Sequence, residues 1–335
     1  MPLVVTMGDP AGIGPELLLA IWRDRAQLSM PPFYVLADSA VMEARASDLG
    51  FDIPIAVCTP EEASERFDEG RLPVVALKNY ADTRCGADIP ASPEVIVEAI
   101  ATAVEHVKAG RASGVVTAPI TKKSLYAAGF QHPGHTEFLG ALAQQYWPVE
   151  PAEPVMMLAG PDLRTVPVTV HIPVDAISAA WTQERITTVA RIVAKDLRNR
   201  FGIVEPRLVL AGLNPHAGEG GTIGTEDEDV SHPAVEELRA EGINIAGPLP
   251  GDTLFHARAR KTYDAALCAY HDQALIPVKT LAFDETVNVT LGLPFVRTSP
   301  DHGTAFDIAS RGIACPDSLV AAIRLAATLC EGDVR

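Results

Sequence analysis

The sequence is short of positive charge. Its 335 residues carry 27 lysines and arginines against 43 aspartates and glutamates, which gives a formal net charge of −16 at pH 7. Nucleic acids and anionic membrane surfaces attract the opposite sign, so we expect neither as a partner. A hydrophobic fraction of 47% makes the chain too apolar for disorder, and its length favours two domains.

Cysteine is scarce, and long apolar runs are missing. The five cysteines are scattered without a CxxC pair, which argues against a disulfide framework and a thiolate zinc site and favours a reducing compartment. No stretch approaches the roughly 20 apolar residues that span a bilayer. The first residues, MPLVVTMGDP, lack the features of a secretory signal. We therefore expect a cytoplasmic enzyme that acts on a small molecule.

The usual glycine-rich nucleotide loops are also absent. The glycines of MGDPAGIGPE do not make GxGxxG, so a Rossmann fingerprint is missing. The turn opens a helix whose N-terminus can face an anion, but Asp9 and Glu16 argue against a tightly bound phosphate there. The loop Gly218–Thr225 lacks the Gly-Lys-Ser/Thr ending of a P-loop, and we interpret it as a flexible active-site loop.

What the sequence does contain is a series of short runs rich in Val, Ile and Leu. They are apolar on both faces and predict buried strands of mainly parallel sheets. The predicted strands are Leu3–Thr6, Phe33–Ala37, Val74–Leu77, Gly114–Ala118, Val155–Ala159, Thr165–Val170, Leu208–Leu213 and Ala265–Tyr270. Amphipathic helices are predicted between them, most clearly at Ser92–Lys108, Thr182–Asn199 and Ser318–Cys330. This alternation indicates an α/β protein with helices on both sheet faces.

Three histidines follow predicted strands. His171, His216 and His271 each stand where such a strand ends, 45 and 55 residues apart. Parallel sheets bind ligands beyond the carboxyl ends of their strands, so the three imidazoles can meet around one zinc, cobalt or similar ion. A single histidine at a strand end is more often only hydrogen-bonded, and that alternative stays open. Asp272, next to His271, is a candidate second-shell carboxylate, general base or turn cap.

Other polar residues interrupt apolar surroundings. Lys279, Asn288 and Arg297 lie within or next to the apolar run that ends near Val296. A buried cation there needs an anionic partner. A bound carboxylate or phosphate supplies one, and an internal ion pair is the alternative. His135 and Thr136 precede an apolar helix and can donate to a phosphate or hydroxyl, although Thr136 can also simply cap the helix.

The sequence resembles a known family. HGTAFDIASRGIACP is similar to the adenosine-binding loop of isopropylmalate and isocitrate dehydrogenases. MGDPAGIGPE, TAPITK, GHTEFL, GLNPHAGEGG, GPLPGDTLF, AYHDQALIPVKT and VNVTLGLPFVRTSPDHGTAFDIA together resemble the 4-hydroxythreonine-4-phosphate dehydrogenase (PdxA) family, in order from residue 6 to about residue 309.

The resemblance implies an isocitrate/isopropylmalate-dehydrogenase-like fold: two α/β/α domains with an interdomain cleft. The implied domains are residues 1–135 plus 285–335 on the cofactor side, and residues 136–284 for metal, substrate and dimerisation. The Pro-rich segment Tyr146–Pro154 and the stretch Thr280–Asn288 are candidate breaks from composition alone. The resemblance also implies a homodimer whose active site is shared between subunits.

Residue roles carry over motif by motif. The implied metal ligands are His171, His216 and His271, with zinc, magnesium or cobalt as the ion. The implied substrate contacts are His135, Thr136, Lys279, Asn288 and Arg297. The implied cofactor contacts, for NAD or NADP, are His302, Gly303 and Asp307. The carboxylate of Asp307 would repel a 2′-phosphate and favours NAD.

The implied reaction is the oxidation of 4-phosphooxy-L-threonine to 2-amino-3-oxo-4-phosphooxybutanoate, which decarboxylates to 3-amino-2-oxopropyl phosphate in pyridoxal 5′-phosphate biosynthesis. Asp272 and Lys279 are both candidates for the base. Three alternatives remain: a paralogue acting on 4-phospho-D-threonate or 4-phospho-D-erythronate, a metal-dependent hydrolase or lyase, and a non-catalytic binder.

Overall fold

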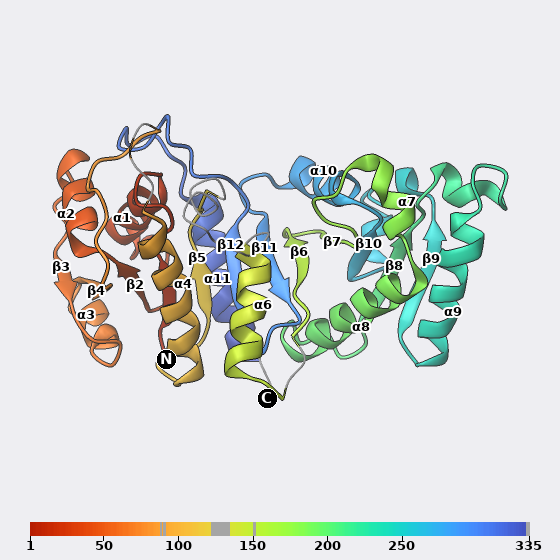
Figure 1. The fold of residues 1–335 in the computed structure, drawn as a ribbon, viewed down its shortest axis with the longest axis horizontal. Helices are drawn as coiled ribbons and strands as arrows, with labels where there is room; N and C mark the ends of the chain where they lie inside the picture. Colours follow the sequence, from red (N-terminus) through yellow and green to blue (C-terminus); the bar gives the residue numbers. More distant parts are fainter. Residues whose placement is uncertain (88, 90–91, 122–134, 150–151, 333–335) are drawn as a thin grey trace. The chain divides into compact units, whose positions relative to one another are not determined.

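The computed structural model describes residues 1–87, 89, 92–121, 135–149 and 152–332, and it divides the chain into two compact units (Figure 1). The first unit combines Met1–Pro154 with Leu293–Cys330, and the second is built on Val155–Gly292. The sequence predicts divisions at residues 135 and 285, whereas the chain divides later at both places. The first division is later because α6 (His135–Tyr146) packs against α4 (Pro93–Lys108) of the first unit.

The first unit contains a parallel sheet. Its strand order is β3 (Ile55–Val57), β4 (Leu72–Ala76), β2 (Phe33–Ala37), β1 (Leu3–Thr6), β5 (Val115–Thr117) and β12 (Arg297–Pro300). The chain moves outward from β1 to one edge and then returns to the other side of β1 with β5. The carboxyl ends of β1 and β5 therefore flank a topological switch point, where such sheets bind ligands.

Helices cover both faces of this sheet. They are α1 (Gly14–Asp24), α2 (Ser39–Asp48), α3 (Ala63–Asp68), α4, α6 and α11 (Asp317–Gly332), the last lying in the first unit as far as Cys330. Right-handed crossovers place α1 and α2 on one face and α4 on the other (Figure 1). Helix α4 follows its predicted range: Pro93 is its first residue, and its apolar stripe is buried.

The second unit contains a mixed sheet. Its strand order is β11 (Val287–Leu291), β6 (Val155–Ala159), β7 (Arg164–Pro167), β10 (Ala265–Cys268), β8 (Arg207–Ala211) and β9 (Asn244–Leu249). Strand β6 pairs antiparallel with β7 and β11, while β7, β10, β8 and β9 pair in parallel. The pairing is mainly parallel, as predicted, and the exception is β6, which forms a hairpin with β7.

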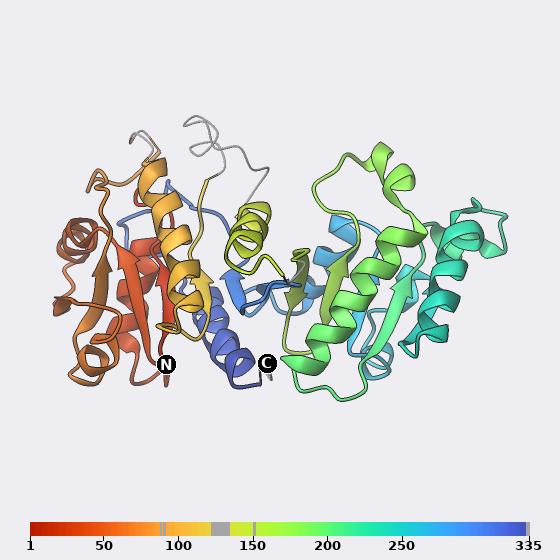
Figure 2. The same cartoon turned by 60° about the horizontal axis from the view of Figure 1, so that its bottom comes forward.

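The helices of the second unit also occupy both faces. They are α7 (Ile177–Ala180), α8 (Gln183–Asn199), α9 (His232–Ala240) and α10 (His271–Leu281), with short turns at η1 (Val174–Ala176), η2 (Pro215–Glu219), η3 (Asp227–Ser231), η4 (Gly251–Thr253) and η5 (Ala259–Lys261). Figure 2 shows α8 and α9 over one face of the sheet and α10 behind it. Ala274, Leu275 and Val278 of α10 join the buried core formed with β6, β8 and β10.

The apolar runs locate the central strands well. β1, β2 and β6 have the predicted bounds, whereas β3, β9, β11 and β12 are not predicted. Strand β9 contains Gly247 and Pro248, and β12 is RTSP, so neither shows an apolar run. None of the helices in the described part of the chain is long and apolar enough to cross a membrane.

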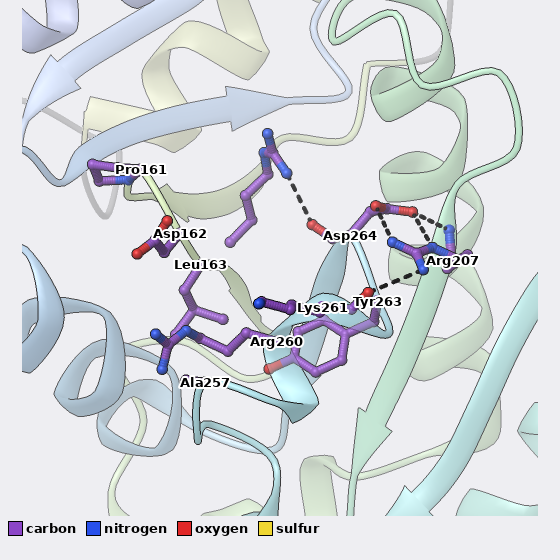
Figure 3. Close-up of a pocket in the computed structure, with 10 residues that line it drawn as sticks. Pro161, Asp162, Leu163, Arg207, Ala257, Arg260, Lys261, Tyr263 and Asp264 are labelled. Carbon is purple, nitrogen blue, oxygen red and sulfur yellow. Dashed lines mark hydrogen bonds and ion pairs between the residues drawn. The ribbon is translucent and has the colours of Figure 1, made fainter.

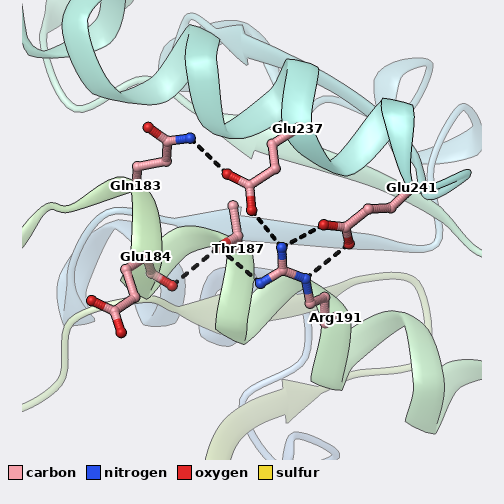
Figure 4. Close-up of polar contacts among 6 residues, drawn as sticks. All are labelled: Gln183, Glu184, Thr187, Arg191, Glu237 and Glu241. Atoms are coloured by element: carbon pink, nitrogen blue, oxygen red, sulfur yellow. Dashed lines mark hydrogen bonds and ion pairs between the residues drawn. The ribbon is translucent and has the colours of Figure 1, made fainter.

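An arginine-centred network joins α8 to α9 on the surface of the second unit (Figure 4). Arg191 of α8 donates to Glu237 of α9 at 2.5 Å and to both oxygens of Glu241, the residue that follows α9, at 2.5 and 2.8 Å. Gln183 donates to the other oxygen of Glu237 at 2.6 Å. The hydrogen bonds from Arg191 hold the pKa of Glu241 below its ordinary value.

Arg191→Met is expected to lower the melting temperature at pH 7. Because Glu241 has a lower pKa folded than unfolded, its contribution is complete above the unfolded pKa of about 4.3 and disappears as the pH falls through the folded pKa. Thermal unfolding at pH 7 and at an acidic pH below the folded pKa of Glu241 should therefore show a difference that vanishes in acid. Lys195→Met, at an exposed position of the same helix, is the control. An equal loss at both pH values would contradict the prediction.

Candidate functional site

Three neighbouring strands bring the predicted metal ligands to one sheet edge. β10 lies between β7 and β8 and is parallel to both, so their carboxyl ends point the same way. The β7–β10 pairing continues past the strands, where the Thr169 amide donates to the Ala269 carbonyl at 3.3 Å. His171 and His271 each follow two residues later. Their ring centroids are 5.5 Å apart.

His271 is oriented by its neighbour. It is the first residue of α10, and its Nδ1 lies 2.7 Å from Oδ1 of Asp272. A carboxylate only accepts hydrogen bonds, so Nδ1 carries the proton and Nε2 is left to bind a ligand. This contact is the one expected if Asp272 orients a metal-binding His271.

The loop with His216 folds back on the end of β8. A Cβ on Gly212 would lie 2.7 Å from Cα of Ala217, so this approach requires glycine. The side chain of Gln273, on the first turn of α10, donates to the Gly212 carbonyl at 3.0 Å and accepts from the Ala269 amide at 2.6 Å. Gln273 thus ties the start of α10 to the ends of both β10 and β8.

Two of the three histidines have unusual backbone conformations. His171 and His216 have φ values of 54° and 53°, in the left-handed region that non-glycine residues rarely occupy. Such conformations cost about 1–3 kcal/mol each and persist only where the surroundings enforce them. Their occurrence at two predicted ligands is typical of a functional edge.

A buried carboxylate that no sequence pattern singles out holds the His216 loop. Asp227 has no exposed surface and accepts hydrogen bonds from the amides of Leu213 and Asn214 at 2.9 and 3.0 Å. It also accepts from the Ser231 hydroxyl at 3.0 Å, and that hydroxyl accepts from Nε1 of Trp181. In the sequence Asp227 stands within the acidic run TEDED, where one buried carboxylate looks like its solvated neighbours.

The donor set suits a borderline divalent ion. Three imidazoles with an open position are typical of catalytic zinc and also bind cobalt. In the part of the chain that the structure describes, however, no group of three or more His, Cys, Asp or Glu side chains comes close enough together to hold a metal ion. The metal site therefore stays a prediction, as does the sharing of the site between subunits.

Lys279 and Asn288 also lie in the second unit. Lys279 stands seven residues after Asp272, on the same face of α10, and its Nζ is 5.5 Å from the ring centroid of Phe283. Asn288 is half-buried in β11, where it pairs with Leu158 of β6.

A second polar cluster lies in the first unit. Arg297 is 3% exposed at the start of β12 and donates to the Thr117 hydroxyl at 2.6 Å. Its guanidinium lies 3.4 Å from Nδ1 of His135, at the start of α6, with Thr136 beside it. Burial lowers the pKa of Arg297 to about 10.

His135 is a neutral imidazole. Burial, and secondarily the Arg297 charge, hold its pKa well below the ordinary value. Because the guanidinium can only donate, Nδ1 accepts and the proton is on Nε2. This Nε2 is buried and has no hydrogen-bond partner among the described residues. An unpaired buried donor costs about 1–3 kcal/mol, which a bound anion would offset.

The loop with the predicted cofactor contacts packs on the N-terminal turn. The Thr304 carbonyl accepts from the Ile13 amide at 3.0 Å, and the Ser310 amide donates to Glu16 at 2.7 Å. His302 is half-buried, and Gly303 and Asp307 are exposed on this loop. The turn itself lies at the switch point, because a Cβ on Gly8 would come within 2.5 Å of the Pro119 carbonyl after β5.

A buried arginine shapes that turn. Arg45 of α2 has no exposed surface and donates to the carbonyls of Gly12 and Pro10 at 2.8 and 3.1 Å. An arginine in an amphipathic helix is usually solvated, so the sequence offered no signal for this role.

The structure thus divides the predicted site residues between the units. The second unit holds His171, His216, His271, Asp272, Lys279 and Asn288. The first unit holds His135, Thr136, Arg297, His302, Gly303 and Asp307.

Comparison with known proteins decides the family. The family model described as pyridoxal phosphate biosynthetic protein PdxA matches residues 29–326. The chain belongs to the PdxA family. Its relatives include proteins named 4-hydroxythreonine-4-phosphate dehydrogenase from Methylorubrum populi, 58% identical over 98% of this chain and 95% of the relative, and from Bradyrhizobium diazoefficiens, 51% identical over 98% and 96%.

Solved structures agree with the PdxA assignment. The 4-hydroxythreonine-4-phosphate dehydrogenase of Klebsiella pneumoniae is 34% identical, with a TM-score of 0.87 and coverage of 98% of this chain and 99% of that one. A terephthalate 1,2-cis-dihydrodiol dehydrogenase from Burkholderia xenovorans is 27% identical, with a TM-score of 0.65 and coverage of 98% of both chains. The predictions of the family, of an α/β dehydrogenase-like fold and of an oxidoreductase are confirmed.

Asp227→Asn is expected to lower the free energy of unfolding by about 1–3 kcal/mol, because an amide NH₂ would face a backbone N–H or hydroxyl that now donates to a carboxylate oxygen. Denaturant unfolding measures the change. Asp229→Asn, at an exposed position of the same turn, is the matched control and should be neutral. Equal stability of both variants would show that Asp227 does not anchor the loop.

Proposed function

We propose that this PdxA-family protein oxidises 4-phosphooxy-L-threonine to 2-amino-3-oxo-4-phosphooxybutanoate with NAD or NADP and a divalent metal. The product then loses CO₂ to give 3-amino-2-oxopropyl phosphate, a step of pyridoxal 5′-phosphate biosynthesis. The observation that carries the proposal is the arrival of three histidines at the carboxyl ends of β7, β10 and β8 in a chain whose relatives bear this enzyme name. A cytoplasmic homodimer with a shared active site belongs to the same proposal.

His171, His216 and His271 would hold the metal, which when bound acts as a Lewis acid on the substrate alcohol. Asp272 keeps His271 in the tautomer with Nε2 free, since its Oδ1 accepts the hydrogen bond from Nδ1–H. Lys279 is then the proposed base. It would accept the C3 hydroxyl proton. A nicotinamide, when bound, would supply the oxidant that takes up the C3 hydride as the alcohol becomes a ketone.

The substrate phosphate is assigned to the cluster of Arg297 and His135. Arg297 supplies a buried positive charge, and Nε2 of His135 supplies a neutral donor without a described partner. Thr136 and Asn288 complete the proposed substrate contacts. A guanidinium favours phosphate, so Arg297 makes phosphate binding favourable in a protein with a net negative charge.

The cofactor is assigned to the switch point between β1 and β5. His302, Gly303 and Asp307 lie on the loop packed against the turn that leaves β1. The exposed Asp307 carboxylate repels a 2′-phosphate, so NAD should have the lower KM in a comparison with NADP.

The deciding experiment combines metal analysis with NAD⁺ reduction. The purified protein should contain a divalent metal and should reduce NAD⁺ with 4-phosphooxy-L-threonine. Faster reduction with 4-phospho-D-threonate or 4-phospho-D-erythronate would instead identify a paralogous activity. Failure with all three substrates would refute the proposed oxidation.

His216→Ala should abolish turnover and deplete bound metal, because two imidazoles hold a divalent ion poorly. Metal content by mass spectrometry and initial rates of NAD⁺ reduction measure both effects. His232→Ala, an exposed histidine of the same unit, should retain metal and activity. Full activity of the wild-type protein after exhaustive chelation would exclude a metal role.

Arg297→Ala should raise KM for the phosphorylated substrate about 10- to 100-fold, the loss expected for a charge-assisted contact, with a smaller change in kcat. Arg297→Lys retains the charge, so its KM should lie between the KM of the wild type and that of the alanine variant. Circular dichroism checks that each variant is folded. An unchanged KM in a folded alanine variant would exclude Arg297 as a phosphate contact.

A further inference from the structure

A pocket lies at the opposite edge of the same three strands (Figure 3). It has a volume of about 430 Å³ and is formed where β7, β8 and β10 begin, whereas the histidines lie where these strands end. Strands of four or five residues separate the two edges by roughly 15 Å. The pocket is therefore separate from the candidate metal site, and its size is typical of small-molecule sites.

The lining is cationic in a strongly acidic protein. Four basic side chains and two carboxylates line the pocket, although the chain as a whole has a net charge of −16. One pair neutralises itself: Arg207 donates to both oxygens of Asp264 at 3.0 and 3.1 Å. Arg164, Arg260 and Lys261 then face a single remaining carboxylate, that of Asp162.

These three cations are poorly compensated. Arg260 donates to the Phe255 carbonyl at 2.6 Å, and its buried Nε has no hydrogen-bond partner among the residues that the structure describes. The ammonium of Lys261 makes no hydrogen bond or ion pair with any residue that the structure describes. Arg164 donates to the Asp264 carbonyl at 3.2 Å and stacks over Phe201, and burial lowers its pKa. An anion in the pocket would supply the missing charge and acceptors.

The position of Asp162 narrows the ligand class. In Figure 3 its carboxylate lies on the same side of the pocket as the Arg260 and Lys261 side chains, away from the Arg207–Asp264 pair. A carboxylate repels a bare anion and accepts hydrogen bonds from a hydroxyl or amine. Guanidinium and ammonium groups, in contrast, favour phosphate.

We propose that this pocket binds a small phosphate monoester with a hydroxyl or amino group, the phosphate contacting Arg260, Lys261 and Arg164 and the hydroxyl or amine contacting Asp162. The site is distinct from the proposed substrate phosphate site at Arg297. Its cationic side chains give this part of an acidic protein a local positive potential that attracts an anion.

The test uses glycerol 3-phosphate as probe on the full-length protein, with inorganic phosphate for comparison. Acetic anhydride labels lysines, and peptide mass spectrometry reads the labelling rate of each one. A ligand at about ten times its dissociation constant should slow labelling of Lys261 about tenfold. Lys195, an exposed lysine of the same unit, should label at an unchanged rate, and sodium chloride at equal ionic strength should protect neither lysine.

This readout is local, so binding at the Arg297 cluster does not imitate it. Arg260→Gln should weaken the protection of Lys261 about five- to tenfold, and Lys195→Gln should leave it unchanged. Asp162→Asn should tighten the binding of inorganic phosphate, because a repelling charge is removed. It should also reduce the preference of the pocket for glycerol 3-phosphate. Equal labelling of Lys261 with and without saturating probe, or equal protection by sodium chloride, would overturn the proposal.

Discussion

Parallel pairing of β7, β10 and β8 is the constraint on which the candidate chemistry depends. Because β10 is hydrogen-bonded to both neighbours in the same direction, the residues that follow the three strands emerge at one edge. His171 and His271 leave their ladder at matching positions, which brings their rings to 5.5 Å. Any change of register would displace one ring relative to the other, so backbone hydrogen bonds far from the chemistry set its geometry.

The edge is held by buried polar groups rather than by apolar packing alone. Asp227 fixes the amides that begin the His216 loop, and Gln273 links the ends of β8 and β10 to the first turn of α10. Such groups are stabilising only when their hydrogen bonds are complete, as they are here for Asp227. Asp227 and Gln273 thus hold the residues just before His216, which keeps a left-handed conformation.

In the first unit, buried cations are the important electrostatic feature. In a protein with a net charge of −16, this candidate anion site relies on a cation kept out of water: Arg297 is almost fully buried beside His135. Arg45 is a second buried cation in this unit. It donates to two carbonyls of the turn after β1 that would otherwise be buried without partners. A buried charge is costly without a hydrogen-bond acceptor. Each of these buried arginines therefore needs an acceptor at a defined position.

The amino-acid sequence alone predicts the α/β class and the central strands, because local apolar runs indicate buried strands. It also indicates the candidate ligands, because three histidines follow such runs. It determined the PdxA family through ordered motifs. It did not determine the irregular strands β9 and β12 or the antiparallel placement of β6, which depend on partners distant in sequence. Nor did it select Asp227 or Arg45, since a charged residue looks solvated until the fold buries it. Only the tertiary structure placed β10 between β7 and β8, because strand adjacency arises from long-range hydrogen bonding that no local pattern encodes.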